Sequence, residues 1–82
     1  MVAAARKIGA KVFVLSNVGE IPDLLILYPS TPSGQLYLIE VKNGKNGLTP
    51  TQKKFFDEWG MCPNIGVCNS VDSMLRFIGA IK

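Results

Sequence analysis

Three charged residues stand at the ends of two otherwise apolar segments of this chain. The segment at 35–42, QLYLIEVK, ends with Glu40 and Lys42, and the preceding segment at 23–28, DLLILY, begins with Asp23. Side chains two residues apart on a strand share a face, so Glu40 and Lys42 would lie side by side. Two carboxylates beside a lysine have the ligand chemistry of a hard divalent cation that activates water. The alternative is an exposed Glu40–Lys42 ion pair of small energetic effect, with Asp23 shaping a turn.

Other hydrolytic chemistry is restricted because the chain contains no histidine. Ser-His-Asp and Cys-His nucleophile systems are therefore excluded, as are nucleases that use a histidine base. The cysteines, Cys62 and Cys68, are too few for a disulfide framework and lack the spacing of a zinc site, so we expect free thiols in a reducing compartment. Hydrolysis by this chain would have to rely on carboxylates, lysine and a metal ion.

The composition predicts one small globular domain. The chain has 82 residues, of which 48% are hydrophobic and 18% charged, and its net charge is +3. A domain of this size leaves apolar surface that a partner chain can cover. The mildly basic charge permits a nucleic-acid partner without requiring one. No apolar run approaches the ~20 residues of a membrane span, so we expect a cytoplasmic protein without a membrane partner.

The pattern of apolar residues, turns and caps predicts an α/β domain with the order α-β-β-β-α-β-α. The first three strands should form an antiparallel meander, and the strand after the second helix should return parallel to the third. The result would be a mixed central sheet flanked by helices. The expected elements are a helix at 2–8, strands at 11–16, 23–28 and 35–42, a helix from Pro50 to Gly60, a strand at 64–68, and a last helix capped by Ser70.

The turn PSTPSG at 29–34 would set the register of the second and third strands. With this loop Tyr28 lies opposite Gln35, and counting outward places Asp23 opposite Glu40. Opposed residues have Cβ atoms about 4.5–5.5 Å apart. Two carboxylates at that distance repel each other unless a cation lies between them, and Mg²⁺ fits this description. A slip of one residue would turn both side chains to the other face.

The second helix begins with a complete cap. Thr49 stands at the N-cap, Pro50 at the first helical position, and Gln52 completes a Thr-x-x-Gln capping box. This cap accounts for Gln52 without any role in a site.

Pro22-Asp23 and Glu40-Val41-Lys42, separated by sixteen residues, resemble the PD-(D/E)xK nuclease signature. That pair of motifs alone is a weak signal. An ordered set of motifs over almost the whole chain, residues 1–82, resembles the VRR-NUC subfamily and is much more specific. Its further pieces are Ala5 and Gly9, Gly19-Glu20-Ile21, Leu48-Thr49-Pro50-Thr51-Gln52, Trp59-Gly60 and Ser70-Val71-Asp72.

The resemblance implies a single nuclease domain with a restriction-endonuclease-like α-β-β-β-α-β core. It implies that Asp23, Glu40 and the backbone carbonyl of Val41 bind Mg²⁺, for which Mn²⁺ would substitute. Lys42 would position or polarise the attacking water and offset charge that develops on the phosphate. Gln52 would lie at the active site from the following helix.

The implied activity is that of a metal-dependent, structure-selective endonuclease that hydrolyses DNA phosphodiester bonds at branched DNA such as Holliday junctions. Stand-alone VRR-NUC proteins are small, are often found in phages and resemble dimeric junction resolvases, so we expect a homodimer in a bacterial or phage-infected cell. Lys45, Lys53 and Lys54 would contact phosphates. The apolar residues left for a dimer interface, unless the domain's own core uses them, are Phe55, Phe56 and Trp59, or Met74, Phe77 and Ile78.

The first helix departs from the family pattern, because members usually carry a glutamate there and residues 1–8 contain no acid. Glu20 is the other acid before Asp23, and we interpret it as a loop residue. The number of metal ions, one or two, therefore remains open. Two alternative functions remain as well: a catalytically weak nucleic-acid-binding domain of the same fold, and a structural or interaction module with incidental charges.

Overall fold

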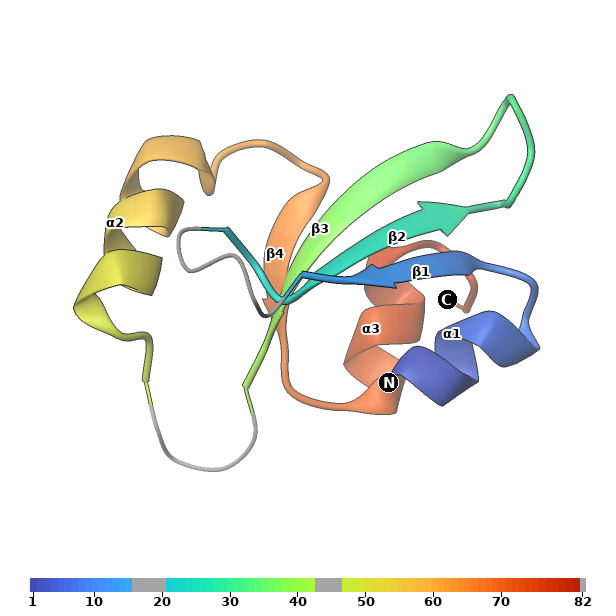
Figure 1. Ribbon diagram of the computed structural model, residues 1–82, viewed down its shortest axis with the longest axis horizontal. Coiled ribbons are helices and arrows are strands. Elements are labelled where there is room, and N and C mark those ends of the chain that lie inside the picture. The colour runs from blue at the N-terminus through green and yellow to red at the C-terminus, as the bar shows by residue number, and fades with distance from the viewer. Residues whose placement is uncertain (16–20, 43–46, 82) are drawn as a thin grey trace.

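A computed structural model describes residues 1–15, 21–42 and 47–81 of the chain (Figure 1). Its elements follow the expected order α-β-β-β-α-β-α. Strand β2 begins after Asp23 and β3 ends before Lys42, each one residue short of the expectation, and the expected end of β1 at Ser16 lies outside the described residues. The elements are α1 (Val2–Lys7), β1 (Lys11–Val14), β2 (Leu24–Tyr28), β3 (Gln35–Val41), α2 (Pro50–Trp59), β4 (Ile65–Cys68) and α3 (Val71–Phe77).

The strands form one sheet in the order β1-β2-β3-β4. Strands β1, β2 and β3 pair antiparallel, while β4 pairs parallel with β3. This confirms the expected meander and the parallel return after α2. The protein is therefore a small α/β domain with a mixed four-stranded sheet and helices.

One face of the sheet forms the core together with α1 and α3. Alternate strand residues point to this face, among them Ile26 and Ile39, which are fully buried. Helix α1 contributes Ala5, α3 contributes Met74, and Ile78 follows at the C-cap of α3. Figure 1 shows these two helices close together on one side of the sheet. Met74 and Ile78 thus belong to the protomer's own core and are not available to a dimer interface.

The opposite face of the sheet is apolar but open. Phe13, Leu36 and Val67 lie on it and each keeps 46% of its surface exposed. Helix α2 stands apart from α1 and α3, at the end of the sheet from which β3 leads into it (Figure 1). Side chains on this face near the end of β3 therefore have α2, and not the main core, as their neighbour.

Helix α2 begins with the expected capping box. The Oγ1 of Thr49 accepts from the backbone N–H of Gln52 at 3.3 Å, and the Oε1 of Gln52 accepts from the backbone N–H of Thr49 at 2.9 Å. Pro50 occupies the first turn, where its missing N–H has no cost. Within residues 1–15, 21–42 and 47–81 no helix is both long and apolar enough to cross a membrane.

Candidate functional site

Strand register brings Asp23 and Glu40 to the same place on the open face. The pairing of β2 with β3 runs from Tyr28 opposite Gln35 to Leu24 opposite Ile39, so the next step aligns Asp23 with Glu40. The expected register is therefore confirmed. Asp23 stays in line with the sheet although it precedes β2, because its carbonyl accepts a 2.6 Å hydrogen bond from the N–H of Leu15.

Glu40 is a buried glutamate, with 2% of its surface exposed. Its neighbour Ile39 faces the core, so Glu40 faces the opposite side of the sheet, toward α2. There the side-chain amide of Gln52 donates a short hydrogen bond to Oε1 of Glu40. A buried carboxylate needs such a partner, because an unpaired one loses its hydration without compensation. Gln52 therefore holds one oxygen of Glu40 in a fixed direction.

Asp23 is half-buried and is held in the same manner. Its Oδ2 accepts from the backbone N–H of Val41 at 3.2 Å. One oxygen of each carboxylate is thus held by a protein donor, and the two acids also interact directly with each other. Val41 contributes its N–H to this arrangement, and the metal-binding role of its carbonyl stays a prediction.

The electrostatics of the pair are those of two like charges forced together. Burial raises the pKa of Glu40 above its ordinary value, and the neighbouring charge of Asp23 raises it further. The ammonium group of Lys42 acts in the opposite direction and lowers the pKa of Glu40. Lys42 follows β3 directly and remains aligned with β4, because its N–H donates to the carbonyl of Cys68 at 3.0 Å. The cluster therefore favours a proton or a cation at the two carboxylates.

Gln52 combines two functions that the sequence presented as alternatives. Its Oε1 takes part in the capping box with Thr49, while its Nε2 donates to Glu40. The cap therefore fixes the side chain whose other end orients the buried acid. Since α2 is joined to the sheet through this contact, the cap also contributes to the shape of the site.

Replacing Gln52 by glutamate is expected to destabilise the metal-free protein at neutral pH by about 1–3 kcal/mol, the range for a buried polar group left without its partner. Glutamate still accepts from the N–H of Thr49, but it cannot donate to Glu40 and adds a negative charge beside it. The pKa of Glu40 in the folded protein then rises further, so the loss is present at neutral pH and shrinks as the pH falls below that pKa. Thermal unfolding between pH 4 and 8, without added metal, measures this.

Thr49→Ala provides the matched control for that substitution. It removes the Oγ1 acceptor of the capping box and leaves the contact between Gln52 and Glu40 in place. It should cost about 0.5–2 kcal/mol with little dependence on pH. If Gln52→Glu showed the same pH-independent loss, Gln52 would be a capping residue and nothing more.

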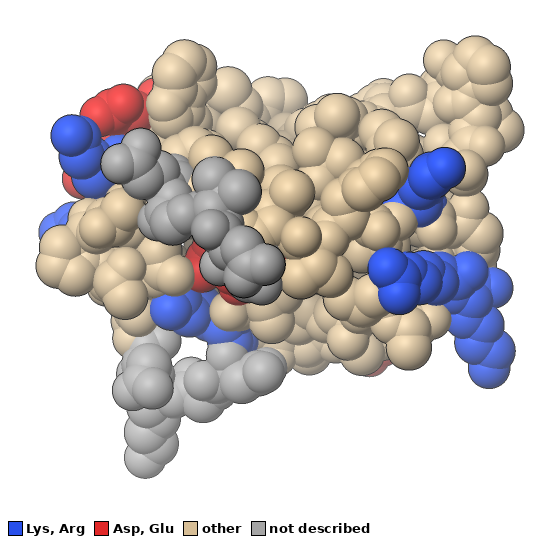
Figure 2. Space-filling model, in the orientation of Figure 1, with Lys and Arg blue, Asp and Glu red and all other residues tan. Residues whose placement is uncertain are grey.

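The lysines expected to contact DNA lie around this site as far as the structure describes them. Lys53 and Lys54 are exposed on α2, next to Gln52, whereas Lys45 lies outside the described residues. Figure 2 shows basic side chains gathered at the α2 end of the visible face, with acidic side chains beside them, and a second basic group at the α1 end. Positive charge is therefore available beside the carboxylates, where a phosphate backbone would run.

The donor set fits a hard divalent cation with few protein ligands. In the part of the chain that the structure describes, no group of three or more His, Cys, Asp or Glu residues comes together. Among the described residues, Asp23 and Glu40 would then supply the carboxylate ligands. Mg²⁺ suits such a site, because it keeps several waters and is commonly bound by one or two carboxylates together with substrate phosphates. Glu20 lies outside the described residues, so its interpretation as a loop residue stays a prediction.

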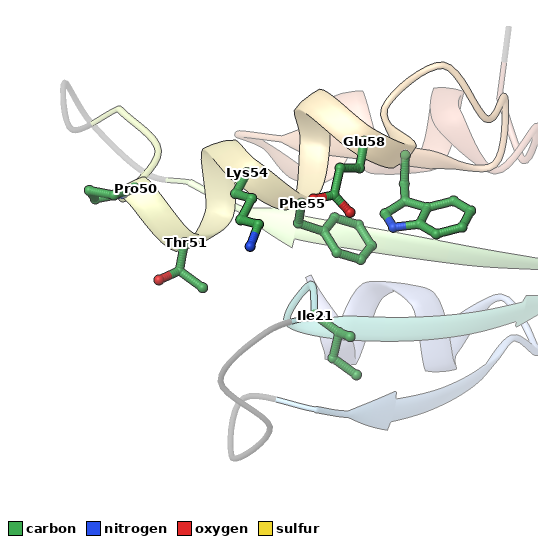
Figure 3. A pocket seen from close by; sticks show the side chains of 7 residues that line it. Ile21, Pro50, Thr51, Lys54, Phe55 and Glu58 are labelled. Atoms are coloured by element: carbon green, nitrogen blue, oxygen red, sulfur yellow. The ribbon is translucent and has the colours of Figure 1, made fainter.

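A pocket against α2 was not predicted from the sequence. It lies between Ile21, just before β2, and one face of α2 that includes Phe55 and Trp59, and it has a volume of about 620 Å³. Figure 3 shows the ring of Phe55 on one wall and Ile21 on the other. The sequence signal was present, since Phe55 and Trp59 are four residues apart on a helix, but this spacing is equally typical of a core-facing stripe.

Comparison with known proteins adds no relative. No protein-family model, no curated protein and no solved structure matches this chain.

Proposed function

We propose that this protein is a metal-dependent DNA endonuclease that hydrolyses phosphodiester bonds. The observation that carries the proposal is the convergence of Asp23 and Glu40 from neighbouring strands, each with one oxygen held by a protein donor. A buried glutamate beside a half-buried aspartate is destabilising when both are charged, so the pair points to a cation as its partner. Burial raises the pKa of Glu40 most, and the charge of Asp23 raises it further, so a bound cation would relieve part of the cost of keeping both acids ionised.

The arrangement of elements supports a restriction-endonuclease-like core. Strands β1 to β3 form a meander, α2 follows, and β4 returns parallel to β3. This is the α-β-β-β-α-β order that the resemblance to VRR-NUC domains implies. Fold alone does not define activity, so the proposal depends on the side chains that the fold places at the end of β3.

Each residue of the cluster has a separate task in the proposed reaction. A divalent cation held at Asp23 and Glu40 would supply charge neutralisation at the phosphate and activation of water. Lys42 offers an ammonium group where negative charge grows on the phosphate as the bond breaks. Gln52 acts by keeping Glu40 in one orientation, and Lys53 by holding the DNA backbone next to the site.

A homodimer is part of the proposal, because paired cuts across a branched DNA need two active sites. The open sheet face with Phe13, Leu36 and Val67 offers apolar surface for it. Trp59 is also exposed, at 53%, whereas Phe77 packs edge-on against Tyr37 at 5.8 Å inside the protomer. The molar mass by light scattering tests this part, and a single-protomer mass under assay conditions would contradict it.

Cleavage assays on a panel of DNAs test the activity. The expected result is cutting of four-way, flapped or bulged DNA with Mg²⁺ or Mn²⁺, little cutting of uninterrupted duplex, and none with chelator. Asp23→Asn protein purified in the same way controls for contaminating nucleases, since asparagine keeps an acceptor for the N–H of Val41 but removes a charge from the pair. Cutting that Asp23→Asn retains would refute the proposal.

The second candidate is a DNA-binding domain that does not cut. It is favoured by one observation: the described helix α1, like residues 1–8 as a whole, contains no acid that could complete the carboxylate set. Salt-dependent binding of the same DNAs, without cleavage in either metal, would support this candidate. Absence of binding at any salt concentration would leave an interaction module as the remaining function.

A further inference from the structure

The pocket between Ile21 and α2 is lined by residues that are close in sequence to those of the carboxylate pair. Ile21 stands two residues before Asp23, and Phe55 stands three residues after Gln52, whose amide holds Glu40. Residues three apart on a helix are neighbours, with Cβ atoms about 5–6 Å apart. A nucleotide whose phosphate lies at the carboxylates would therefore have its base within reach of the pocket.

The lining of the pocket suits a flat, uncharged group. Phe55 and Trp59 present aromatic surface from α2, and Ile21 faces Phe55 from the opposite wall (Figure 3). Trp59 is 53% exposed and Ile21 37% exposed, so this apolar surface is uncovered in the protomer. The volume of about 620 Å³ lies within the range of about 300–1,000 Å³ that is usual for small-ligand sites.

The charged residues of the pocket favour a neutral base over a phosphate as its occupant. Lys54 and Glu58 both line it, and because their charges are opposite the pocket does not select an anion. A phosphate would meet the carboxylate of Glu58, whereas a neutral base meets the apolar walls. The net charge of +3 suits the polyanionic remainder of such a ligand better than an acidic or purely apolar partner.

We propose that this pocket binds one unpaired nucleobase of the DNA strand that lies on Asp23 and Glu40, an inference that rests on the proposed function. The base enters between Ile21 and Phe55 and stacks on the aromatic rings, a contact that tolerates any base. A base inside a duplex must first be extruded, whereas one at a bulge, flap or junction is already unpaired. The pocket therefore gives the nuclease its preference for interrupted DNA.

Trp59 makes the test direct, because it is the chain's single tryptophan and lines the pocket. The probes are a labelled duplex with one bulged nucleotide, the same duplex with an abasic residue in the bulge, and the fully paired duplex, all with Ca²⁺ in place of Mg²⁺ so that a hard cation is present at the carboxylates. The bulged duplex is expected to change Trp59 fluorescence and to bind more tightly than the other two. Phe55→Ala should weaken its binding about 5- to 150-fold and leave the paired duplex unaffected.

Two further variants and three outcomes complete the design. Val71→Ala changes an exposed apolar residue outside the pocket and should leave all binding unchanged. Phe55→Tyr keeps the aromatic ring and should bind the bulged duplex as tightly as the wild type. Circular dichroism verifies that the Phe55→Ala protein is folded.

Equal binding of the bulged and abasic duplexes, with unchanged Trp59 fluorescence, would overturn the base pocket and leave the nuclease proposal standing. Absence of binding to every duplex would overturn both. Trp59 fluorescence that depends on protein concentration without DNA would assign the pocket to a second copy and overturn the base pocket alone.

Discussion

Lys42→Met is expected to lower the rate of DNA cleavage about 10²–10³-fold, the usual loss when one group that stabilises transition-state charge is removed. Methionine keeps most of the apolar stem of the lysine side chain, so the strand end should fold as before. The ammonium group also lowers the pKa of Glu40, so its removal raises that pKa. The acid limb of the cleavage rate should consequently move to higher pH. Single-turnover rates at saturating enzyme, measured across pH, check both effects.

Binding separates this catalytic role from simple attraction of the backbone. Lys42→Met should leave DNA affinity in chelator within a few fold, with an unchanged slope of log affinity against log salt. Lys53→Met is the matched control, because Lys53 is exposed on α2 and is expected to contact a phosphate. Its loss should reduce the salt slope by about 0.9 while the single-turnover rate at saturation stays the same. If Lys42→Met reduced the salt slope and left the cleavage rate unchanged, Lys42 would be a phosphate contact and not a catalytic group.

Much of the site follows from local rules. The turn at 29–34 sets the β2–β3 register, and the register places Asp23 opposite Glu40. The capping box at Thr49 and the order of elements likewise depend on short stretches of sequence, because caps and turns are determined by neighbouring residues.

The remainder of the site depends on how elements pack. Burial of Glu40 and the bond to its carboxylate from Gln52 depend on where α2 lies relative to β3, which no spacing within either element specifies. The pocket beside Phe55 exists for the same reason. Met74 and Ile78 could be assigned from the sequence to one apolar face of α3, but whether that face met the sheet or a second copy was decided by the tertiary structure.

Glu40→Gln is expected to raise the melting temperature of the metal-free protein at neutral pH while it abolishes the response to Mg²⁺. Glutamine has the same shape and no charge. Its carbonyl can accept from Nε2 of Gln52, and its amide can donate to the carboxylate of Asp23 where two like charges now meet. Each kcal/mol gained corresponds to about 4–8 °C for a domain of this size. Cleavage should fall at least about 100-fold, since even an outer-shell partner of a metal costs 10–100-fold.

The difference in stability between Glu40→Gln and the wild type should depend on pH. The pKa of Glu40 is raised in the folded protein, so its protonated form contributes stability that is fully present below the unfolded pKa and is lost as the pH rises through the folded value. The stability advantage of Glu40→Gln should therefore be largest at neutral pH and vanish below about pH 4, near the pKa of an unfolded glutamate.

Mg²⁺ at about 100 times its dissociation constant should stabilise the wild type by about 2.7 kcal/mol and the variant not at all. Asp57→Asn, an exposed acid on α2, should change neither quantity. A lower melting temperature for metal-free Glu40→Gln at neutral pH would mean that the carboxylates do not repel each other, and the argument for a cation between them would fail.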